Sequence, residues 1–170
     1  PGASIVALQV FTRFNSSSTC GSTPPCVLSY TSDQVLALNG VAALAGPTNA
    51  SRIAAVNMSL GGGRYTSQAT CDAANASNGL KAAIDNLRSL GIAVVISSGN
   101  SGYRDSISAP GCISSAVSVG STTDLAPVSV SRFSNNAPFL SLYAPGSNIV
   151  SSVPGGTYTS FNGTSMAAPH

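Results

Sequence analysis

Two side chains near the end of the chain could carry nucleophilic chemistry: Ser165 and the single histidine, His170, both within "NGTSMAAPH" (162–170). A serine hydroxyl becomes a strong nucleophile when a neighbouring base accepts its proton. Five residues along a helix rotate by roughly 500°, which leaves two side chains about 140° apart and separated by about 7.5 Å of rise. A base must approach its nucleophile to about 2.6–3.2 Å. The spacing therefore excludes His170 as the base for Ser165 and predicts a structural role for this histidine.

The residues around Ser165 predict that it lies at or near the start of a helix. Residues 166–168 are good helix formers, and Pro169 is tolerated only in the first turn of a helix. There the hydroxyl is exposed, and the nearby N–H groups point toward any negative charge that develops. A serine that only caps the helix is the alternative. The G-x-S-x-A pattern also faintly resembles the nucleophile elbow of α/β hydrolases, but "SFNGTS" supplies no clear strand before the turn.

Asn100 is a second candidate, because it follows the apolar run "IAVVIS" (92–97) within "SGNSG". A side-chain amide held at the end of a buried strand can donate a hydrogen bond to an oxyanion. The alternative is an asparagine that tolerates an unusual backbone angle in a tight turn. The stretch alone leaves both interpretations open.

The apolar pattern alternates between strands and helices. Strands are expected at 3–11, 52–60, 92–97 and 115–121, and helices at 31–46 and 73–90. Loops are expected at 12–31 and 64–71. After residue 124 the pattern changes to short segments, with a turn at 154–156. This order predicts an α/β fold with a parallel sheet and right-handed crossovers. Sites in such sheets form at the carboxyl ends of strands, which points to "SLGG" (59–62) and "SSGN" (97–100).

Three local signals concern the ends and faces of the expected helices. Thr31 and Gln34 have the spacing of a capping box. Asp85 and Arg88 are expected to form an i,i+3 ion pair. Gly91 is well placed to be the residue that follows the end of the second helix.

Charged residues make up 7% of the 170 residues, against about 25% in a typical soluble domain, and the net charge is +2. The scattered basic residues leave no footprint for nucleic acid. No apolar run reaches the roughly 18 residues of a membrane span. The chain starts without Met and without a basic leader. We expect residues 1–170 to form one domain that interacts with neither nucleic acid nor membrane.

Four cysteines allow three pairings. Cys20 and Cys26 bracket the turn-rich "GSTPP", so their proximity favours a bond and leaves Cys71 with Cys112. Four buried free thiols in a cytosolic protein are the alternative. Disulfides imply an oxidising compartment, and we expect a secreted or periplasmic protein. No cysteine–histidine spacing indicates a metal site.

Several stretches together resemble the subtilisin-like serine proteases. They are "VNMSLGGG", "VVISSGNSG", "SAVSVGSTT", "FLSLYAPGSNIVSS" and "FNGTSMAAPH", which occur in that order and extend the resemblance over essentially the whole chain. "GTSMAAPH" is highly specific by itself. The resemblance implies a three-layer α/β fold, with a mostly parallel central sheet flanked by helices, truncated at both ends.

The resemblance also assigns roles by position. Ser165 matches the catalytic nucleophile, and Asn100 matches the amide of the oxyanion hole, which acts with the N–H of Ser165. Substrate binding is implied for Ser59, Leu60, Gly61, Ser98, Gly99 and Thr164, and "APG" (109–111) matches the back of the pocket. Because "SLGG" and "APG" contain no acid, we expect a roomy, uncharged pocket. His170 matches a family histidine that is not the catalytic one.

The departure from the family pattern concerns the rest of the triad. The family order is Asp, His, Ser, but neither a "D-T/S-G" nor an "H-G-T-H" motif occurs here. We expect an interior fragment of the catalytic domain of a serine endopeptidase, nearly inactive by itself, whose base and acid lie upstream. A pseudoprotease that binds peptides without cleavage and an esterase are the alternatives.

The remaining expectations follow from the family. The substrate would be a polypeptide, and the protein is expected to be a monomer. The chemistry requires no cofactor and no metal, although structural calcium is frequent in the family and could occur in the intact protein.

Overall fold

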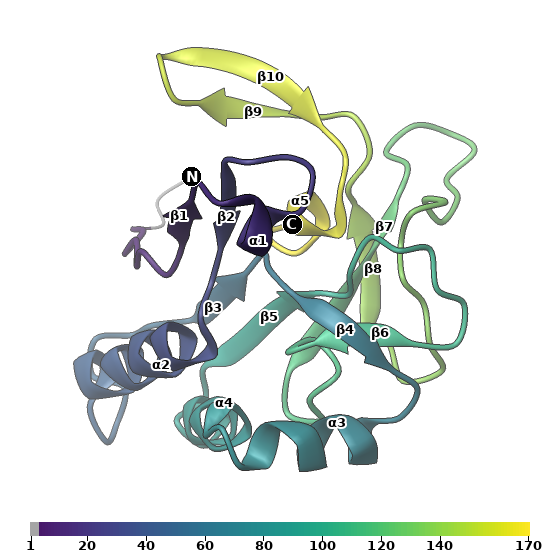
Figure 1. Cartoon of the computed structure of the whole chain (residues 1–170). Coiled ribbons are helices and arrows are strands. Elements are labelled where there is room, and N and C mark those ends of the chain that lie inside the picture. The colour runs from purple at the N-terminus through teal and green to yellow at the C-terminus, as the bar shows by residue number, and fades with distance from the viewer. Residues whose placement is uncertain (1–3) are drawn as a thin grey trace.

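A computed structural model describes residues 4–170 (Figure 1). The elements in chain order are β1 (Thr12–Phe14), α1 (Ser17–Cys20), β2 (Cys26–Leu28), α2 (Thr31–Ala45), β3 (Ala55–Met58), β4 (Gly62–Tyr65), α3 (Gln68–Ala76), α4 (Leu80–Ser89), β5 (Ala93–Ser97), β6 (Ile107–Ala109), β7 (Val117–Thr122), β8 (Leu142–Pro145), β9 (Ile149–Val153), β10 (Thr157–Phe161) and α5 (Thr164–Ala167).

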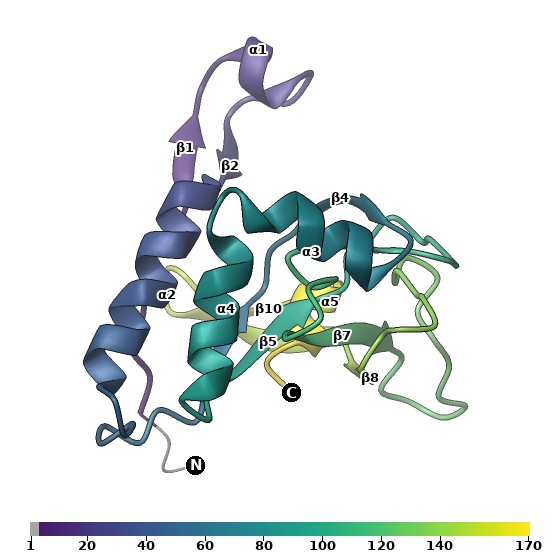
Figure 2. The ribbon, with the colours of Figure 1, turned by 90° about the horizontal axis from the view of Figure 1, so that it is seen from below.

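The centre of the fold is a four-stranded sheet in the order β3-β5-β7-β8, and all three pairings are parallel. Successive side chains of a strand point to opposite faces. Val94 and Ile96 of β5 accordingly pack in the large apolar core with residues of α2 and α4, which lie side by side in Figure 2. Val95 packs in a small cluster with Ala167 of α5 on the other face. Helices on both faces of a parallel sheet confirm the predicted α/β architecture.

Three antiparallel strand pairs surround this sheet: β1–β2, β4–β6 and β9–β10. The β9–β10 hairpin, which turns at 154–156 as expected, projects at the top of Figure 1. β4 begins shortly after the expected strand 52–60 and pairs irregularly with β6. Both expected loops contain short elements. The loop at 12–31 holds β1 and β2, which pair with each other, and the loop at 64–71 holds the end of β4 at Tyr65 and the start of α3 at Gln68.

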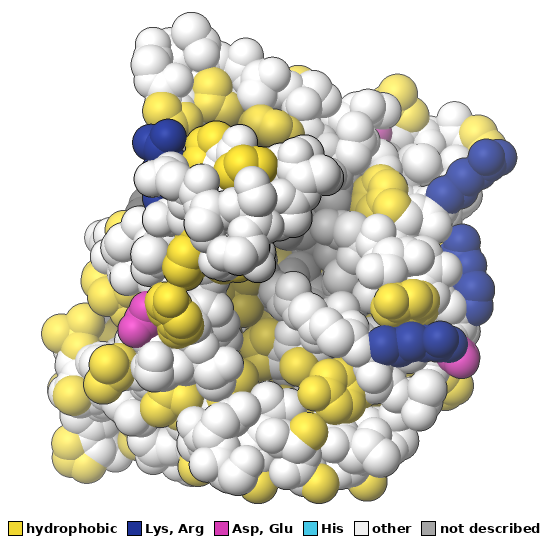
Figure 3. All heavy atoms as spheres, in the orientation of Figure 1, with side chains coloured by type: hydrophobic (Ala, Val, Ile, Leu, Met, Phe, Trp, Pro, Cys, Tyr) yellow, Lys and Arg dark blue, Asp and Glu magenta, His cyan; other side chains and the backbone are white. Residues whose placement is uncertain are grey.

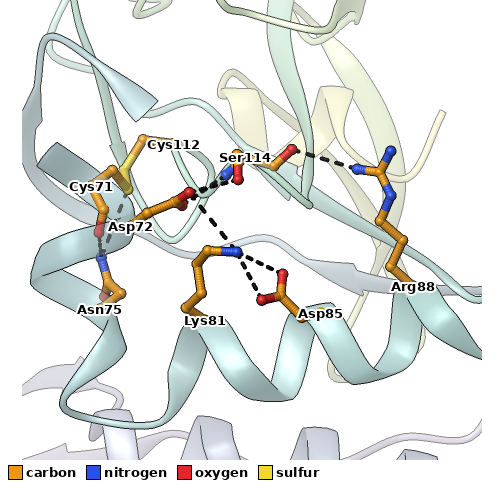
Figure 4. A network of polar contacts seen from close by, with 8 residues as sticks. All are labelled: Cys71, Asp72, Asn75, Lys81, Asp85, Arg88, Cys112 and Ser114. Atoms are coloured by element: carbon orange, nitrogen blue, oxygen red, sulfur yellow. Dashed lines mark hydrogen bonds and ion pairs between the residues drawn. A yellow bond between two sulfur atoms is a disulfide. The ribbon is translucent and has the colours of Figure 1, made fainter. Parts of the chain in front are cut away.

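Both expected disulfides are present, Cys20–Cys26 and Cys71–Cys112. The second joins α3 to the segment after β6. Beside it, Asp72 accepts hydrogen bonds from the N–H of Ser114 (3.0 Å) and from its hydroxyl (2.6 Å), as Figure 4 shows. A covalent bond and a carboxylate thus fix α3 against the loop that follows the "APG" segment.

The helix expected at 73–90 is two helices, α3 and α4. Gly79 breaks it with a φ of 81°, in the left-handed region that favours glycine, and the side-chain oxygen of Asn78 accepts from the N–H of Leu80. The expected Asp85–Arg88 pair is also wrong. Asp85 instead lies 2.8 Å from Lys81, an i,i+4 partner, and Arg88 reaches the carbonyl of Ser114 (Figure 4). Gly91, with a φ of 74°, follows α4 as predicted.

The capping box expected at Thr31 and Gln34 is wrong. α2 begins at Thr31 itself, with Tyr30 as its N-cap residue and no side-chain cap. The amide of Gln34 is buried and donates to the hydroxyl of Ser29 (3.2 Å). The helix ends at Ala45, before Gly46, which agrees with the expected end.

The strand expected at 3–11 is wrong over residues 4–11, while residue 3 lies outside the described residues. No strand of the described chain pairs with this segment, and Ile5 and Val6 are 91% and 66% exposed. An apolar β pattern becomes a strand only where a neighbour receives its backbone hydrogen bonds. The edge of β3 away from β5 likewise pairs with no described strand.

Replacement of Ile84 by alanine should lower the free energy of unfolding by about 2–5 kcal/mol, because this α4 side chain is fully buried in the large core and its removal leaves a cavity. Urea unfolding of the intact protein measures the change. Leu36→Ala in α2 is the control, since Leu36 is 69% exposed and should alter stability by less than about 0.5 kcal/mol. Equal losses for the two variants would contradict this account of the core.

Candidate active site

The candidate site is a hollow of about 550 Å³ where β3 and β5 end and α5 begins. Its lining consists of Leu60, Gly61, Gly62, Gly63, Arg64, Ser97, Gly99, Asn100, Ser101, Tyr103, Ser108, Thr164 and Ser165. In the space-filling view, mostly uncharged atoms surround the central hollow, and most Lys and Arg side chains lie toward the edges (Figure 3). The parallel sheet therefore brings the two predicted loops, 59–62 and 97–100, to one place.

Ser165 lies in the first turn of α5, directly after Thr164, as the sequence predicts. Its half-buried hydroxyl donates to the carbonyl of Ser59 (3.3 Å), and the hydroxyl of Ser59 donates to the carbonyl of Ser165 (2.7 Å). The backbone N–H of Ser165 has no hydrogen-bond acceptor among residues 4–170, as is usual in the first turn of a helix. Ser165 thus offers the hollow both a hydroxyl and a free N–H donor.

Thr164 fixes the orientation of the Asn100 amide. The side-chain oxygen of Asn100 accepts from the N–H and the hydroxyl of Thr164, both at 2.8 Å. Because a backbone N–H can only donate, the oxygen of Asn100 must face Thr164, which leaves its Nδ2 donors for the hollow. The fully buried Thr164 hydroxyl also accepts from the N–H of Gly99 (3.1 Å). A neutral donor and a serine hydroxyl therefore line one hollow.

The alternative explanation of Asn100, an unusual angle in a tight turn, does not hold. The residues with positive φ other than glycine in the described chain are Asn49, Arg52 and Asn148. The left-handed positions around Asn100 are those of Gly99, with a φ of 105°, and Gly102, with a φ of 68°. Asn100 is not needed for the turn, so the orientation of its side chain is the property that remains to be explained.

His170 does not approach Ser165. Its exposed ring donates from Nδ1 to the carbonyl of Met166 (2.8 Å), one turn back along the chain. This agrees with the helical geometry expected from the sequence. Since His170 is the single histidine of the 170 residues, no imidazole of this chain can act on Ser165.

The residues expected to bind substrate are divided by the structure. Leu60, Gly61, Gly99 and Thr164 line the hollow, and Ser59 lies beside Ser165. Ser98 is fully buried behind the wall, where its hydroxyl donates to the carbonyl of Asn135. The preceding residue, Ser97, lines the hollow instead, because alternate residues of β5 face opposite ways.

Sequence reasoning missed Arg64, which lines the hollow, and the expectation of an uncharged pocket is wrong in this respect. Its Nη2 lies 2.9 Å from each carboxylate oxygen of Asp105, and its Nε donates to Ser106 (3.0 Å). The guanidinium also lies 4.8 Å from the ring centre of Tyr103. The charge of Arg64 is therefore paired at the rim of the hollow. Its partner Asp105 is 41 positions away in the sequence, so no local motif indicated this ion pair.

A second hollow of about 620 Å³ lies on the other side of the segment 60–63. Residues of α2 and α4, including Gln34 and Leu80, line it together with Leu60 and Gly63. β4 begins in this segment and, in the described chain, pairs only with β6, so its other edge is open. An extended ligand could pair with this edge and fill the hollows on its two sides.

The described residues contain no group of three or more His, Cys, Asp or Glu side chains that could hold a metal ion. Within residues 4–170, no helix has the length and apolarity needed to cross a membrane.

Comparison with known proteins gives one consistent family. A model of the subtilase family matches residues 28–170. Subtilisin BL from Lederbergia lenta is 44% identical over 91 residues, which are 54% of this chain and 33% of that protein. Subtilisin-like protease 1 from Arthroderma gypseum is 39% identical over 117 residues, 69% of this chain and 21% of that protein. The chain thus spans a third or less of the length of these relatives.

Solved structures agree with the fold. A cold adapted subtilisin-like serine proteinase superimposes with a TM-score of 0.64 and 36% identity, over 84% of this chain and 45% of that chain. Sphericase superimposes with a TM-score of 0.69 and 26% identity, over 84% and 47%. These matches confirm the predicted subtilisin-like fold class.

The ion pair at the rim should be visible in the titration of Asp105. The hydrogen bond from Arg64 is the largest cause that holds the pKa of this carboxyl below its usual value, followed by a hydrogen bond from Ser106 and, more weakly, by the charge of Arg64. Arg64→Ala should therefore raise the pKa of Asp105, measured by NMR. Because the folded-state pKa is lowered, the stability that the pair contributes is present at neutral pH and lost as the pH falls through the titration of Asp105.

Lys81→Ala is the matched control. A hydrogen bond from Lys81 is the main cause of the lowered pKa of Asp85, so this variant should raise the pKa of Asp85 and leave that of Asp105 unchanged. An unchanged Asp105 pKa in Arg64→Ala would show that the pair does not persist in solution.

Proposed function

The chain belongs to the subtilase family, and on that premise we propose that the intact protein is a serine endopeptidase that cleaves peptide bonds through an acyl-enzyme. The observation that carries this proposal is the convergence of three groups on one hollow. They are the hydroxyl of Ser165, its unbonded N–H, and the Nδ2 donors of Asn100 that Thr164 orients.

Ser165 is proposed as the nucleophile. Its Oγ attacks the carbonyl carbon of the scissile peptide bond, and the carbonyl oxygen gains negative charge. Asn100 Nδ2 and the N–H of Ser165 donate to that oxygen, where charge develops only as the tetrahedral intermediate forms. Both donors are held before the reaction, so little reorganisation is needed when the charge appears.

The base and the group that orients it are proposed to come from outside these 170 residues. His170 is bonded to Met166 rather than to Ser165, and the chain has no other histidine. The base would take the proton of Ser165 during attack and give it to the leaving amine. In a subtilisin, loss of the catalytic histidine alone lowers kcat by about 10⁶-fold. The 170 residues alone should therefore be nearly inactive.

A polypeptide is the substrate class that the open edge supports. An extended peptide that pairs along residues 60–62 would place its side chains toward the two hollows. The rim charge of Arg64 is already paired with Asp105, so the site does not demand an acidic substrate. The two disulfides support an extracytoplasmic location. We expect the intact protein to act as a monomer, without a cofactor in the reaction.

A peptide-binding protein without protease activity is the second candidate. The observation that favours it is that no base lies within reach of Ser165 in the described residues. Such a protein would keep the open edge and both hollows and would bind peptides without turnover.

Ser165→Ala in the intact protein should abolish hydrolysis of a peptide substrate, with a loss in kcat of about 10⁶-fold, and should remove labelling by a fluorophosphonate. Ser151→Ala, an exposed serine of β9, is the control and should leave both unchanged. Peptide and ester substrates are compared in the same assay. Retained peptide hydrolysis by Ser165→Ala would overturn the assignment, and turnover of esters alone would indicate an esterase.

Asn100→Ala should lower kcat by about 10²–10³-fold with little change in KM, because the lost donor acts on charge that appears only in the transition state. The expected magnitude is the one measured for removal of the oxyanion-hole asparagine of a subtilisin. Steady-state kinetics of the intact protein provide the measurement. A rise in KM at constant kcat would instead indicate that Asn100 binds the ground state.

A further inference from the structure

Asn135 is a fully buried asparagine in the segment between β7 and β8. It lies outside every motif that the sequence singled out and does not line the hollow. Its side-chain amide nevertheless bonds to the segment that carries Asn100 and to Ser108, which belong to two walls of the hollow. A buried amide with that pattern requires an explanation beyond packing.

The side chain of Asn135 brackets the loop that carries Asn100. Its Nδ2 donates to the carbonyl of Ser98 (3.0 Å), just before Gly99 and Asn100. Its Oδ1 accepts from the N–H of Ser101 (2.9 Å) and from that of Tyr103 (3.2 Å), just after them. One amide thus holds the chain on both sides of the candidate oxyanion donor.

The backbone of Asn135 adds two contacts to the same loop. Its N–H donates to the carbonyl of Gly99 (2.9 Å), and its carbonyl accepts from the hydroxyl of Ser98 (3.0 Å). A Cβ on Gly99 would overlap Nδ2 of Asn135 and Oγ of Ser108. The loop therefore follows the surface of the asparagine closely and has no room to move toward it.

The same amide reaches the opposite wall of the hollow. Nδ2 of Asn135 also lies 3.3 Å from Oγ of Ser108, a lining residue, whose hydroxyl donates to the carbonyl of Gly63. Asn135 is thereby linked to β6 and, through Ser108, to the start of β4. The loop of Asn100 and the strand that would receive a peptide share one buried partner.

We propose that Asn135 is a positioning residue for the reaction: its amide holds the Asn100 donor in register with Ser165 and couples that donor to the wall of the substrate hollow. The inference rests on the proposed function, because it assigns to Asn135 the placement of an oxyanion donor. Asn135 acts through Asn100 and Ser108 and does not itself contact a reacting atom.

The amide is needed because both of its ends are used. Its nitrogen meets two acceptors, the carbonyl of Ser98 and the hydroxyl of Ser108, and its oxygen meets two N–H donors. Aspartate has nearly the same shape but would place a carboxylate oxygen against the Ser98 carbonyl. A buried polar group that loses its partner is destabilised, and the loop would shift to relieve it.

A double-mutant cycle tests the proposal in the intact protein. Asn135→Asp should lower kcat by about 10²-fold, the loss typical of a small displacement of a catalytic group, with a smaller change in KM. In an Asn100→Ala background the same change should lower kcat by less than about threefold, because the group that Asn135 positions is gone. Equal fold-losses in the two backgrounds would overturn the proposal, as would unchanged kcat in the single variant.

Asn136→Ala is the matched control, since the neighbouring side chain makes no hydrogen bond within residues 4–170 and its loss should leave kcat unchanged. If Asn135→Asp does not fold, Asn135→Ser serves in the same cycle, because the smaller side chain fits the space and is too short to replace the amide contacts with Ser98, Ser101 and Tyr103. The same non-additivity is expected, and additive losses would overturn the proposal.

An NMR measurement separates this inference from the proposed function. The side-chain NH₂ signals of Asn100 should shift in Asn135→Asp and stay in place in Asn136→Ala, whether or not the protein turns over peptides. A wild-type protein without hydrolysis or Ser165 labelling, but with this shift, would contradict the protease and support the positioning. If the Asn100 signals do not shift in Asn135→Asp, the positioning role of Asn135 is overturned, even in an active protease.

Discussion

The parallel pairing of β3 with β5 is the constraint on which the candidate site depends. Its register, from Ala55 beside Ala93 to Met58 beside Ile96, ends both strands at the same edge of the sheet. Paired residues of these two strands are 38 positions apart in the sequence. The segments that follow them, 59–62 and 97–100, nevertheless leave the sheet side by side. The further pairing of β5 with β7 gives α5 its platform, because α5 packs on these strands through Val95, Val119 and Ala167. A shift of one residue in this register would turn every side chain of β5 to the other face and separate Asn100 from Thr164.

Neutral hydrogen bonds, rather than ions, hold the site together. Many of the buried polar side chains are serines, including Ser97, Ser98 and Ser108. Among the described residues, Ser115 Oγ is the one buried side-chain nitrogen or oxygen atom that has no hydrogen-bond partner. Each such bond contributes only about 0.5–1.5 kcal/mol net, but a buried group left unpaired destabilises by more. Low charge therefore does not mean a loosely held site. The hydroxyls and amides behind the hollow form a network in which moving one member leaves its neighbours unpaired.

Under the proposed function, the site that these residues form lacks one component. It has a hydroxyl, the N–H donors of Ser165 and Asn100, and an open strand edge between two hollows, and no histidine of the described residues reaches the hydroxyl. Its relatives are two to three or more times longer than the matched part of this chain. Residues 4–11 expose apolar side chains, and the outer edge of β3 exposes backbone hydrogen-bonding groups. No described strand covers either of them. In the proposed protease, the group that accepts the proton of Ser165 would therefore come from another part of the protein.

The sequence by itself determined the parts that depend on local spacing. Alternation of strands and helices predicted the parallel α/β sheet, the five-residue spacing separated His170 from Ser165, and the cysteine spacing predicted both disulfides. It failed mainly where a partner distant in the chain decides the outcome. Residues 4–11 have a strand pattern but no neighbour to pair with, and Arg64 lines the hollow because it pairs with Asp105, 41 residues away. One local prediction also failed, since Asp85 pairs with Lys81 at i,i+4 and not with Arg88 at i,i+3. Asn135 gave no signal at all, because its role exists only where the end of β5 and the strand β6 approach one amide. Local spacing fixes which groups a chain offers, whereas tertiary structure decides which of them meet, since a hydrogen bond depends on distance in space and not on distance along the chain.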